Sequence, residues 1–422
     1  NYYYMVNCII LLSFIFEVVT LTLIEKKMWG TLYTPLNVLM LPFAAVALFS
    51  IAFVEVNSFY PFCYDSLLLW EIGLLVFFVP SALIRFLMPN NVDFSCLNIK
   101  NDLNIRSFTM ILLSILILYG LYILKSAREM QSAASVGSDE FADKTSMFGP
   151  WAHVFVIVIA LEIFCFQFIN RKRWWLIFGI LLCVLYGVIA QVKGWVLIPI
   201  FAGIFVNVFS NKLKLNFKKI SSVCLLGFGF FFLSYYLSLV VSKDEQMSDK
   251  VFFFIFRNFT HYLTSGVLGL SMDMGRGILE PYNPDYLYTP FVNIYNLMTG
   301  NQMSTGVSPY YLMTTWPGLL TNIRSFMGTI YIYGGPFWGS LTILLFSSIA
   351  YSIRAFRIAR QSSLLLPLDA WFCAILFMGW FDYYFALLKP YEILLFLWLL
   401  PYFFGKKVVS SDKKVKDNDL QR

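Results

Sequence analysis

Residues 188–200, VIAQVKGWVLIPI, contain one lysine, Lys193, between two apolar runs at 174–190 and 195–210. Each run has the length and composition of a helix that crosses a membrane. A charge at the centre of a bilayer costs roughly 2.5–3.5 kcal/mol on insertion scales, so a lysine in such sequence is expected beside water or in a functional site. The stretch therefore predicts two membrane helices joined by the short turn QVKG, with Lys193 in the turn.

The composition of the whole chain extends this interpretation. Hydrophobic residues make up 59% of the 422 residues, charged residues only 13%, and the mean hydropathy is +0.71. These values exclude a water-soluble globule and predict an all-α polytopic membrane protein with about eleven spans. An additional helix before Asn1 would raise the number to twelve. The predicted spans are 4–24, 36–55, 66–88, 107–124, 151–169, 174–190, 195–210, 220–241, 326–352, 364–384 and 388–404.

The positions of the basic residues predict the orientation of the chain. Lys and Arg near the ends of spans are retained on the cytoplasmic side. With the basic tail at 406–422 in the cytoplasm, alternate loops put about two thirds of the 31 Lys and Arg residues on that side. These loops include RKR at 171–173 and RAFRIAR at 354–360. The net charge of +7 then reflects topology and predicts no nucleic-acid partner.

The span pattern divides the chain into four regions. We expect a helix bundle at 1–242, a large periplasmic loop with amphipathic helices at 243–325, further transmembrane helices at 326–405 and a cytoplasmic basic tail at 406–422. The seven cysteines lie mostly inside predicted spans, so they predict no disulfide framework. Motifs for metal ions, nucleotides or dinucleotides are missing from the sequence, and we expect no metal and no cofactor.

The large loop contains the strongest candidate for a catalytic segment. Residues 251–277, VFFFIFRNFTHYLTSGVLGLSMDMGRG, are rich in aromatic residues and predict a helix that lies along or dips into the membrane surface. Arg257 and His261 are four residues apart, so a helix would put them on one face. Asp273 and Arg276 follow in the same segment. A structural role for the histidine, hydrogen-bonded inside the loop, is the alternative.

Aromatic and amide side chains gather later in the same loop. Tyr310, Trp316 and Asn322 lie in a stretch rich in Tyr, Trp, Asn and Pro, which is typical of sugar-binding clefts but also of the aromatic belt at a membrane interface. Arg324 lies where the loop re-enters the membrane. An arginine at this place on the less basic side runs against the charge rule and predicts an anionic partner in the headgroup layer. Lys193 fits the same partner, unless it only marks a helix end.

The chain resembles the oligosaccharide repeat-unit polymerases, also called Wzy-type O-antigen polymerases, in two stretches. QVKGWVLIPIF resembles the basic periplasmic turn before a long apolar helix, with Lys193 where arginine is usual. TNIRSFMGTIYIYGGPFWGSL resembles the exit from the large loop, with Asn322, Gly334, Gly335 and Gly339 in similar places. An acidic residue that is frequent before the glycine pair is replaced here by Ile332 and Tyr333, so no carboxylate role transfers from it.

The resemblance implies a fold and a reaction. By analogy the fold is GT-C-like, a helical membrane fold of transferases that use lipid-linked sugars. The implied reaction joins undecaprenyl diphosphate-linked oligosaccharides at the periplasmic face of the bacterial inner membrane, with membrane lipids and a chain-length regulator as further partners. Its catalytic candidates are His261 as base and Asp273 in reserve. The candidates for binding the diphosphate are Lys193, Arg257, Arg276 and Arg324, and those for the glycan are Tyr310, Trp316 and Asn322.

Two other functions remain open. An O-antigen ligase would use the same donor with lipid A core as acceptor. A lipid-linked oligosaccharide flippase or transporter would break no bond, and the acidic residues Glu17, Glu71, Glu162 and Asp382 in apolar sequence are compatible with transport.

Overall fold

The structure is a computed structural model of the 422-residue chain. It describes residues 2–54, 59–89, 105–129, 150–166, 174–189, 193–236, 249–277, 282–303, 311–312, 320–360 and 365–404.

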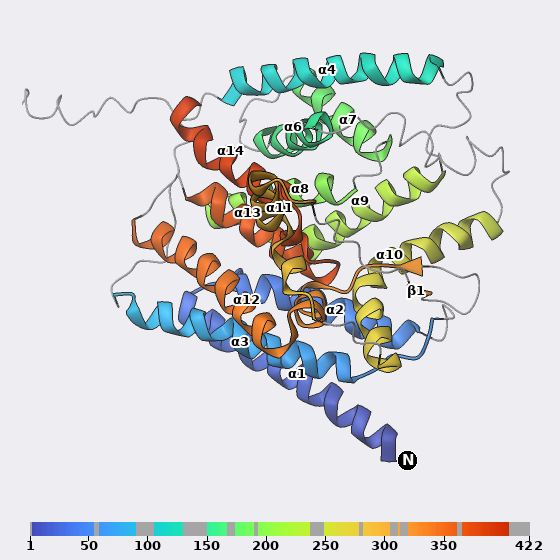
Figure 1. The fold of residues 1–422 in the computed structure, drawn as a ribbon, viewed down its shortest axis with the longest axis vertical. Coiled ribbons are helices and arrows are strands. Elements are labelled where there is room, and N and C mark those ends of the chain that lie inside the picture. Colours follow the sequence, from blue (N-terminus) through green and yellow to red (C-terminus); the bar gives the residue numbers. More distant parts are fainter. Residues whose placement is uncertain are drawn as a thin grey trace, which may run out of the picture.

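These residues form helices almost throughout, with one short β-hairpin (Figure 1). The first group comprises α1 (Tyr2–Trp29), α2 (Pro35–Phe53), α3 (Asp65–Leu87), α4 (Ile105–Glu129), α6 (Pro150–Phe166), α7 (Trp174–Ile189), α8 (Lys193–Phe209) and α9 (Phe217–Tyr236). The large loop contributes α10 (Asp249–Arg276), η3 (Pro284–Tyr288), α11 (Thr289–Thr299), β1 (Tyr311–Leu312) and β2 (Leu320–Thr321). The last group comprises α12 (Phe326–Ala359), α13 (Leu366–Phe377), η4 (Met378–Trp380), η5 (Tyr384–Ala386) and α14 (Lys389–Phe404).

The helices support the prediction of a polytopic membrane protein. Every predicted span coincides with a helix, within a few residues at most ends. In the described part of the chain, five helices are long and apolar enough to cross a membrane, namely α1, α2, α3, α4 and α12. Shorter apolar helices lie at 153–166, 174–187, 194–209 and 366–380. The all-α fold with several helices that could span a membrane is therefore confirmed, while the number of eleven spans stays a prediction.

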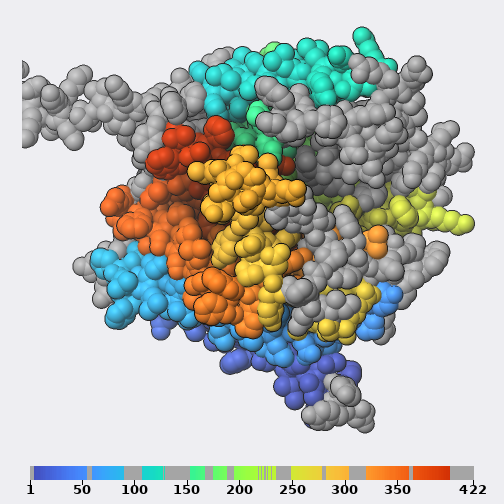
Figure 2. Space-filling view, viewed as in Figure 1, coloured from blue at the N-terminus to red at the C-terminus, as the bar shows by residue number. Residues whose placement is uncertain are grey.

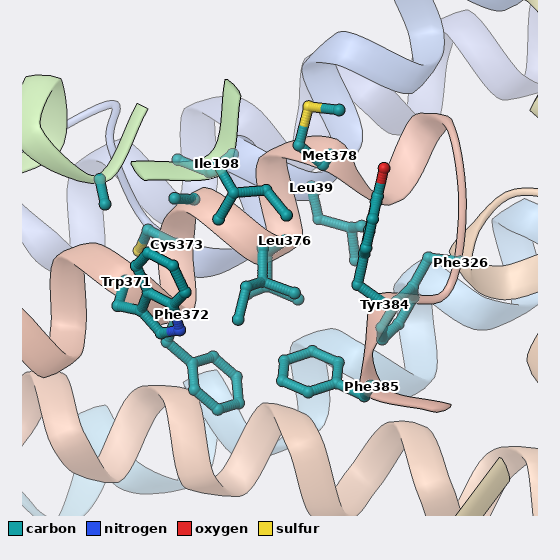
Figure 3. Packing of buried hydrophobic residues seen from close by; sticks show 14 of the residues in the cluster. Leu39, Ile198, Phe326, Trp371, Phe372, Cys373, Leu376, Met378, Tyr384 and Phe385 are labelled. Atoms are coloured by element: carbon teal, nitrogen blue, oxygen red, sulfur yellow. The ribbon is translucent and has the colours of Figure 1, made fainter. Parts of the chain in front are cut away.

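The helices pack in two groups that share a middle layer. In Figure 1, α1, α2, α3 and α12 form the lower part, and α4, α6 and α7 form the upper part. Helices α8 and α13 pack against each other between them, with α8 also contacting α6 and α13 also contacting α2 and α12. Figure 3 shows this middle layer, where Trp371, Phe372 and Leu376 of α13 pack with Ile198 of α8 and Phe385 of η5. The core thus fixes the connection that follows α13.

Helix α12 is broken near its start, which corrects the single predicted span at 326–352. Gly335 has φ 64° and ψ −172°, a backbone conformation that only glycine adopts readily. The break brings the two arms together, because a Cβ on Gly339 would lie 3.2 Å from the carbonyl oxygen of Ile330. The arm at 336–359 is about 36 Å long at roughly 1.5 Å per residue, enough to cross the bilayer alone. The arm at 326–334 is a short buried helix.

Two of the three arginines in the predicted cytoplasmic stretch 354–360 are buried side chains of α12, namely Arg354 and Arg357. Arg354 Nη2 donates to Asp369 Oδ1 at 3.1 Å, and Arg357 Nε donates to Asp369 Oδ2 at 2.7 Å. Both guanidinium groups also lie over the ring of Phe209, at 4.7 and 5.0 Å. These two charges therefore tie α12 to α13, and they are weaker indicators of topology than the sequence suggests.

Candidate functional site

The second half of α10 is buried because glycines let other backbone segments approach it closely. A Cβ on Gly266 would lie only 2.1 Å from the carbonyl oxygen of Phe381, and a Cβ on Gly269 would lie 2.1 Å from that of Ile323. Any side chain at either position would force the segments apart. The two glycines therefore hold the 320–325 and 378–382 segments against α10.

The 320–325 segment follows α10 residue by residue. His261 makes a hydrogen bond to the backbone of Leu320, Gly269 contacts Ile323, and Asp273 forms an ion pair with Arg324. The predicted helix at 251–277 is confirmed, with Arg257 and His261 on one face of α10. The large loop thus carries its titratable groups to the head of α12 instead of holding them in a separate extramembrane unit.

Arg324 is the centre of the site. Its side chain is only 2% exposed, its Nε donates to Asp273 Oδ2, and its Nη1 donates to the carbonyl oxygen of Asn322 at 3.3 Å. Arg324 also lowers the pKa of Asp382, so the two groups lie close enough to interact. The sequence predicts an arginine that faces lipid headgroups; the structure instead shows a buried arginine with a carboxylate partner.

The residue after Arg324 has a strained backbone. Ser325 has φ 62° and ψ 170°, a conformation that costs a non-glycine residue on the order of 1–3 kcal/mol. The backbone N–H of Ser325 donates to the carbonyl oxygen of Phe381 at 3.2 Å, and Trp70 Nε1 donates to Ser325 Oγ at 3.2 Å. Such strain persists only where the surroundings enforce it, and it is common at functional sites. Here the strained conformation of Ser325 fixes the direction in which the chain passes from Arg324 into α12.

Asp382 has a pKa suited to proton transfer near neutral pH. Burial raises the pKa of its carboxyl to about 6, against the lowering effects of the Tyr383 backbone N–H and Arg324. The sequence puts Asp382 inside the predicted span 364–384, but α13 ends at Phe377 and Asp382 lies in the connection between η4 and η5. It is therefore a residue of the site and not a charge within a helix.

His261 is a much weaker base than the sequence suggests. Burial and the nearby Arg257 lower the pKa of His261 to about 4, although the hydrogen bond to Leu320 raises it. The ring is 8% exposed, and its Nδ1 has no hydrogen-bond partner among the described residues. At neutral pH the imidazole is therefore uncharged and can accept a hydrogen bond.

Lysines stand at the first residues of two neighbouring helices, α8 and α14. Lys389 lies over the ring of Trp195, with its Nζ 5.7 Å from the ring centroid. Tyr384 packs edge-on against the same ring, which joins these helix heads to the segment that holds Asp382. Lys193 is the first residue of α8. A lysine at a helix N-terminus is disfavoured by the helix dipole, so both positions favour an anionic partner.

The remaining predicted residues lie in different places. Arg276 is at the exposed end of α10, with its guanidinium 5.3 Å from the ring of Tyr60. Asn322 contributes its backbone carbonyl to Arg324. Tyr310 and Trp316 lie outside the described residues, as does the side chain of Lys193.

The sequence does not predict the ion pair of His153 or the position of Lys389, and it predicts Asp382 only as an acid inside a span. His153 Nδ1 lies 3.3 Å from Glu392 Oε2, which ties the heads of α6 and α14 together. Asp382 and Lys389 belong to the stretch MGWFDYYFALLKPYE at 378–392. The signals that could have identified them are an acid among aromatic residues at the end of a span and a Lys-Pro pair that begins the next helix.

Among the described residues, no three His, Cys, Asp or Glu side chains are arranged to hold a metal ion.

Comparisons with known proteins give one match. Neither a curated protein nor a solved structure matches the chain. A family of unknown function, DUF6337, matches residues 56–411, which is most of the chain. The protein therefore belongs to the DUF6337 family.

Proposed function

We propose that the protein is a membrane glycosyltransferase that joins undecaprenyl diphosphate-linked oligosaccharide repeat units at the periplasmic face of the bacterial inner membrane. The observation that carries the proposal is the buried carboxyl of Asp382, whose pKa is about 6 and which lies near the Arg324–Asp273 ion pair at the head of a broken helix. A base with a pKa near the working pH is what a sugar hydroxyl needs to become a nucleophile.

The proposed reaction is one displacement at the anomeric carbon of the donor glycan. The hydroxyl oxygen of the acceptor sugar forms a bond to that carbon, and the bond from the carbon to the diphosphate oxygen breaks. Asp382 takes the proton of the hydroxyl, and undecaprenyl diphosphate leaves with the bonding electron pair. Fixed positive charges stabilise the negative charge that develops on the leaving oxygen. In this proposal Lys193 and Lys389, at the heads of α8 and α14, supply those charges.

The other candidate residues have supporting roles in this scheme. Asp273 holds Arg324 in place through their ion pair. It is not the base, because a carboxylate bound to a guanidinium is a poor proton acceptor. His261 accepts a hydrogen bond from a sugar hydroxyl through Nδ1, next to the positive charge of Arg257. Arg276 remains a candidate for binding the diphosphate, and Tyr310, Trp316 and Asn322 remain candidates for binding the glycan. A chain-length regulator is a proposed partner, and no cofactor takes part.

The experiment that tests the proposal is the surface glycan profile of a strain that lacks the gene. Loss of a polymerase leaves a lipopolysaccharide core with single repeat units, and re-expression of the protein restores the ladder. A bare core with accumulated lipid-linked polymer would instead identify a ligase, which uses the same donor chemistry with lipid A core as acceptor.

One observation favours a second candidate, a lipid-linked oligosaccharide transporter. Glu162 in α6 is fully buried, and neither carboxylate oxygen has a hydrogen-bond partner among the described residues. Glu17 in α1 and Glu71 in α3 interact with each other at a second intramembrane position. Buried acids within membrane helices often mark ion or substrate pathways. Loss of all glycan export in the deletion strain would support transport and contradict the polymerase.

A further inference from the structure

Helix α11 exposes its apolar face and shelters its polar amide side chains, which is the opposite of a helix on a surface in contact with water. Its exposed side chains are almost all large and apolar, with Met298 82% exposed and Leu297 67% exposed. Its two amide side chains, Asn293 and Asn296, are on the more sheltered face. The exposed apolar residues are Phe291, Ile294, Tyr295, Leu297 and Met298.

Contacts from η3 and from the start of α11 hold this segment against α12, α14 and the connection before α14. The hydroxyl of Tyr288, the residue before α11, lies 2.6 Å from Thr342 Oγ1 in the long arm of α12. Tyr383 Oη donates to the carbonyl oxygen of Leu287 at 3.1 Å. Phe291 packs edge-on against Tyr391 of α14, with ring centroids 4.9 Å apart. The position of α11 is therefore set by α12 and α14.

The exposed apolar face of α11 continues onto the outward flank of α12. Thr342 accepts the contact from Tyr288 and donates its own hydrogen bond to the carbonyl oxygen of Trp338 at 2.7 Å. Figure 2 shows the gold atoms of this segment beside the orange surface of α12 and the red surface of α14. The exposed residues of α12 near the contact are Phe337, Trp338, Leu341 and Leu345. Because α12 is long and apolar enough to cross a membrane, we expect its exposed apolar flank to face lipid.

We propose that α11 lies in the lipid bilayer, with its apolar face in contact with acyl chains at the level of the α12 flank. In water these side chains would form an exposed apolar patch, and removing apolar surface from water is favourable. A bilayer removes that cost, and the sheltered asparagines then face the protein, as expected for a helix in an apolar medium. The large loop at 243–325 is thus partly embedded in the membrane and not wholly periplasmic. This proposal does not depend on the proposed enzyme activity.

Fluorescence quenching in liposomes tests the proposal. Met298 is replaced by the fluorescent amino acid dansylalanine, and Asp285, an exposed residue of η3, receives the same replacement as a matched control. Each full-length variant is reconstituted in phosphatidylcholine with or without bromine on the acyl chains. Iodide added to the buffer serves as the aqueous quencher.

We expect brominated lipid to quench the fluorophore at residue 298 and iodide to leave it bright, with the opposite result at residue 285. Replacement at Leu297 provides a second position on the same face and should behave like residue 298. Quenching of residues 297 and 298 by iodide but not by brominated lipid would overturn the proposal. Protection from both quenchers would also overturn it, because another protein segment would then cover α11.

Discussion

Arg324 connects three parts of the chain at the scale of single residues. It forms an ion pair with Asp273 of α10, bonds the carbonyl of Asn322 and interacts with Asp382 after η4. The sequence predicts an important arginine here, because one at the less basic end of a span is unusual. It could not predict the partners, since contacts between residues distant in the chain depend on how α10 and the α13–α14 connection pack. In our proposal the role of base therefore passes from His261 to Asp382.

The first prediction concerns Asp382 as the base. Its carboxyl must be ionised to take a proton, and its pKa is about 6, so polymerisation by the purified protein should rise as the pH increases through about 6. The measurement is the rate of polymer formation from lipid-linked repeat units across a pH series. Asp382→Asn should remove the activity at every pH, while Asp382→Glu should retain part of it. An unchanged pH profile in Asp382→Asn would exclude this residue as the base.

The second prediction concerns His261 and stability. The pKa of His261 is lowered to about 4 in the folded protein, so the unfolded chain binds more protons between pH 4 and 6.5. The contribution is present above pH 6.5 and is lost as the pH falls towards 4. It amounts to about 3 kcal/mol, since one pKa unit corresponds to roughly 1.4 kcal/mol. His261→Asn should flatten the dependence of the unfolding midpoint on pH.

His153 provides the control for this measurement, because the chain has only two histidines. His153 is partly exposed, so His153→Asn is the matched substitution outside the buried face of α10. If both variants keep the native slope, burial of His261 is not the origin of the pH dependence.

At the scale of elements, the sequence predicts helices well and their interruptions poorly. Apolar runs mark nearly all the helix positions, because length and composition decide whether a segment can cross a bilayer. The break in α12 at Gly335 and the end of α13 before Asp382 do not change the local hydropathy. A hydropathy pattern therefore cannot predict these two helix interruptions. The sequence shows Gly335 in a glycine pair, but only its positive φ angle shows that the helix turns there. The inverted polarity of α11 likewise becomes visible only when exposure is known.

The third prediction tests the close approach of α10 to the α13–α14 connection. A Cβ on Gly266 would lie 2.1 Å from the carbonyl oxygen of Phe381 and 2.6 Å from that of Trp380, both backbone atoms that cannot rotate away. Gly266→Ala should therefore lower the unfolding midpoint, with a cost of about 1–3 kcal/mol for overpacking. Gly229→Ala in α9 is the matched control, since no described atom lies within 4 Å of the added carbon. The control should be neutral or stabilising because alanine favours helix. Equal midpoints for the two variants would mean that α10 does not pack as described.

At the scale of the whole molecule, the buried ion pairs among the described residues lie in two layers. One layer contains Arg354, Arg357 and Asp369 at the predicted cytoplasmic ends of α12 and α13. The other contains the site around Arg324 and the lysines at the heads of α8 and α14. The first layer is closed by its own ion pairs and stabilises the bundle. The second layer includes groups that favour an external anion, and it is where we expect substrate to bind.

The most direct test of the proposed enzyme compares surface glycans in the deletion strain carrying Asp382→Asn or the exposed control Asp285→Asn, at equal abundance in the membrane. If Asp382 is the base of a repeat-unit polymerase, Asp285→Asn restores the full ladder and Asp382→Asn leaves only single repeat units on the core. A full-length ladder with Asp382→Asn would contradict the proposed mechanism.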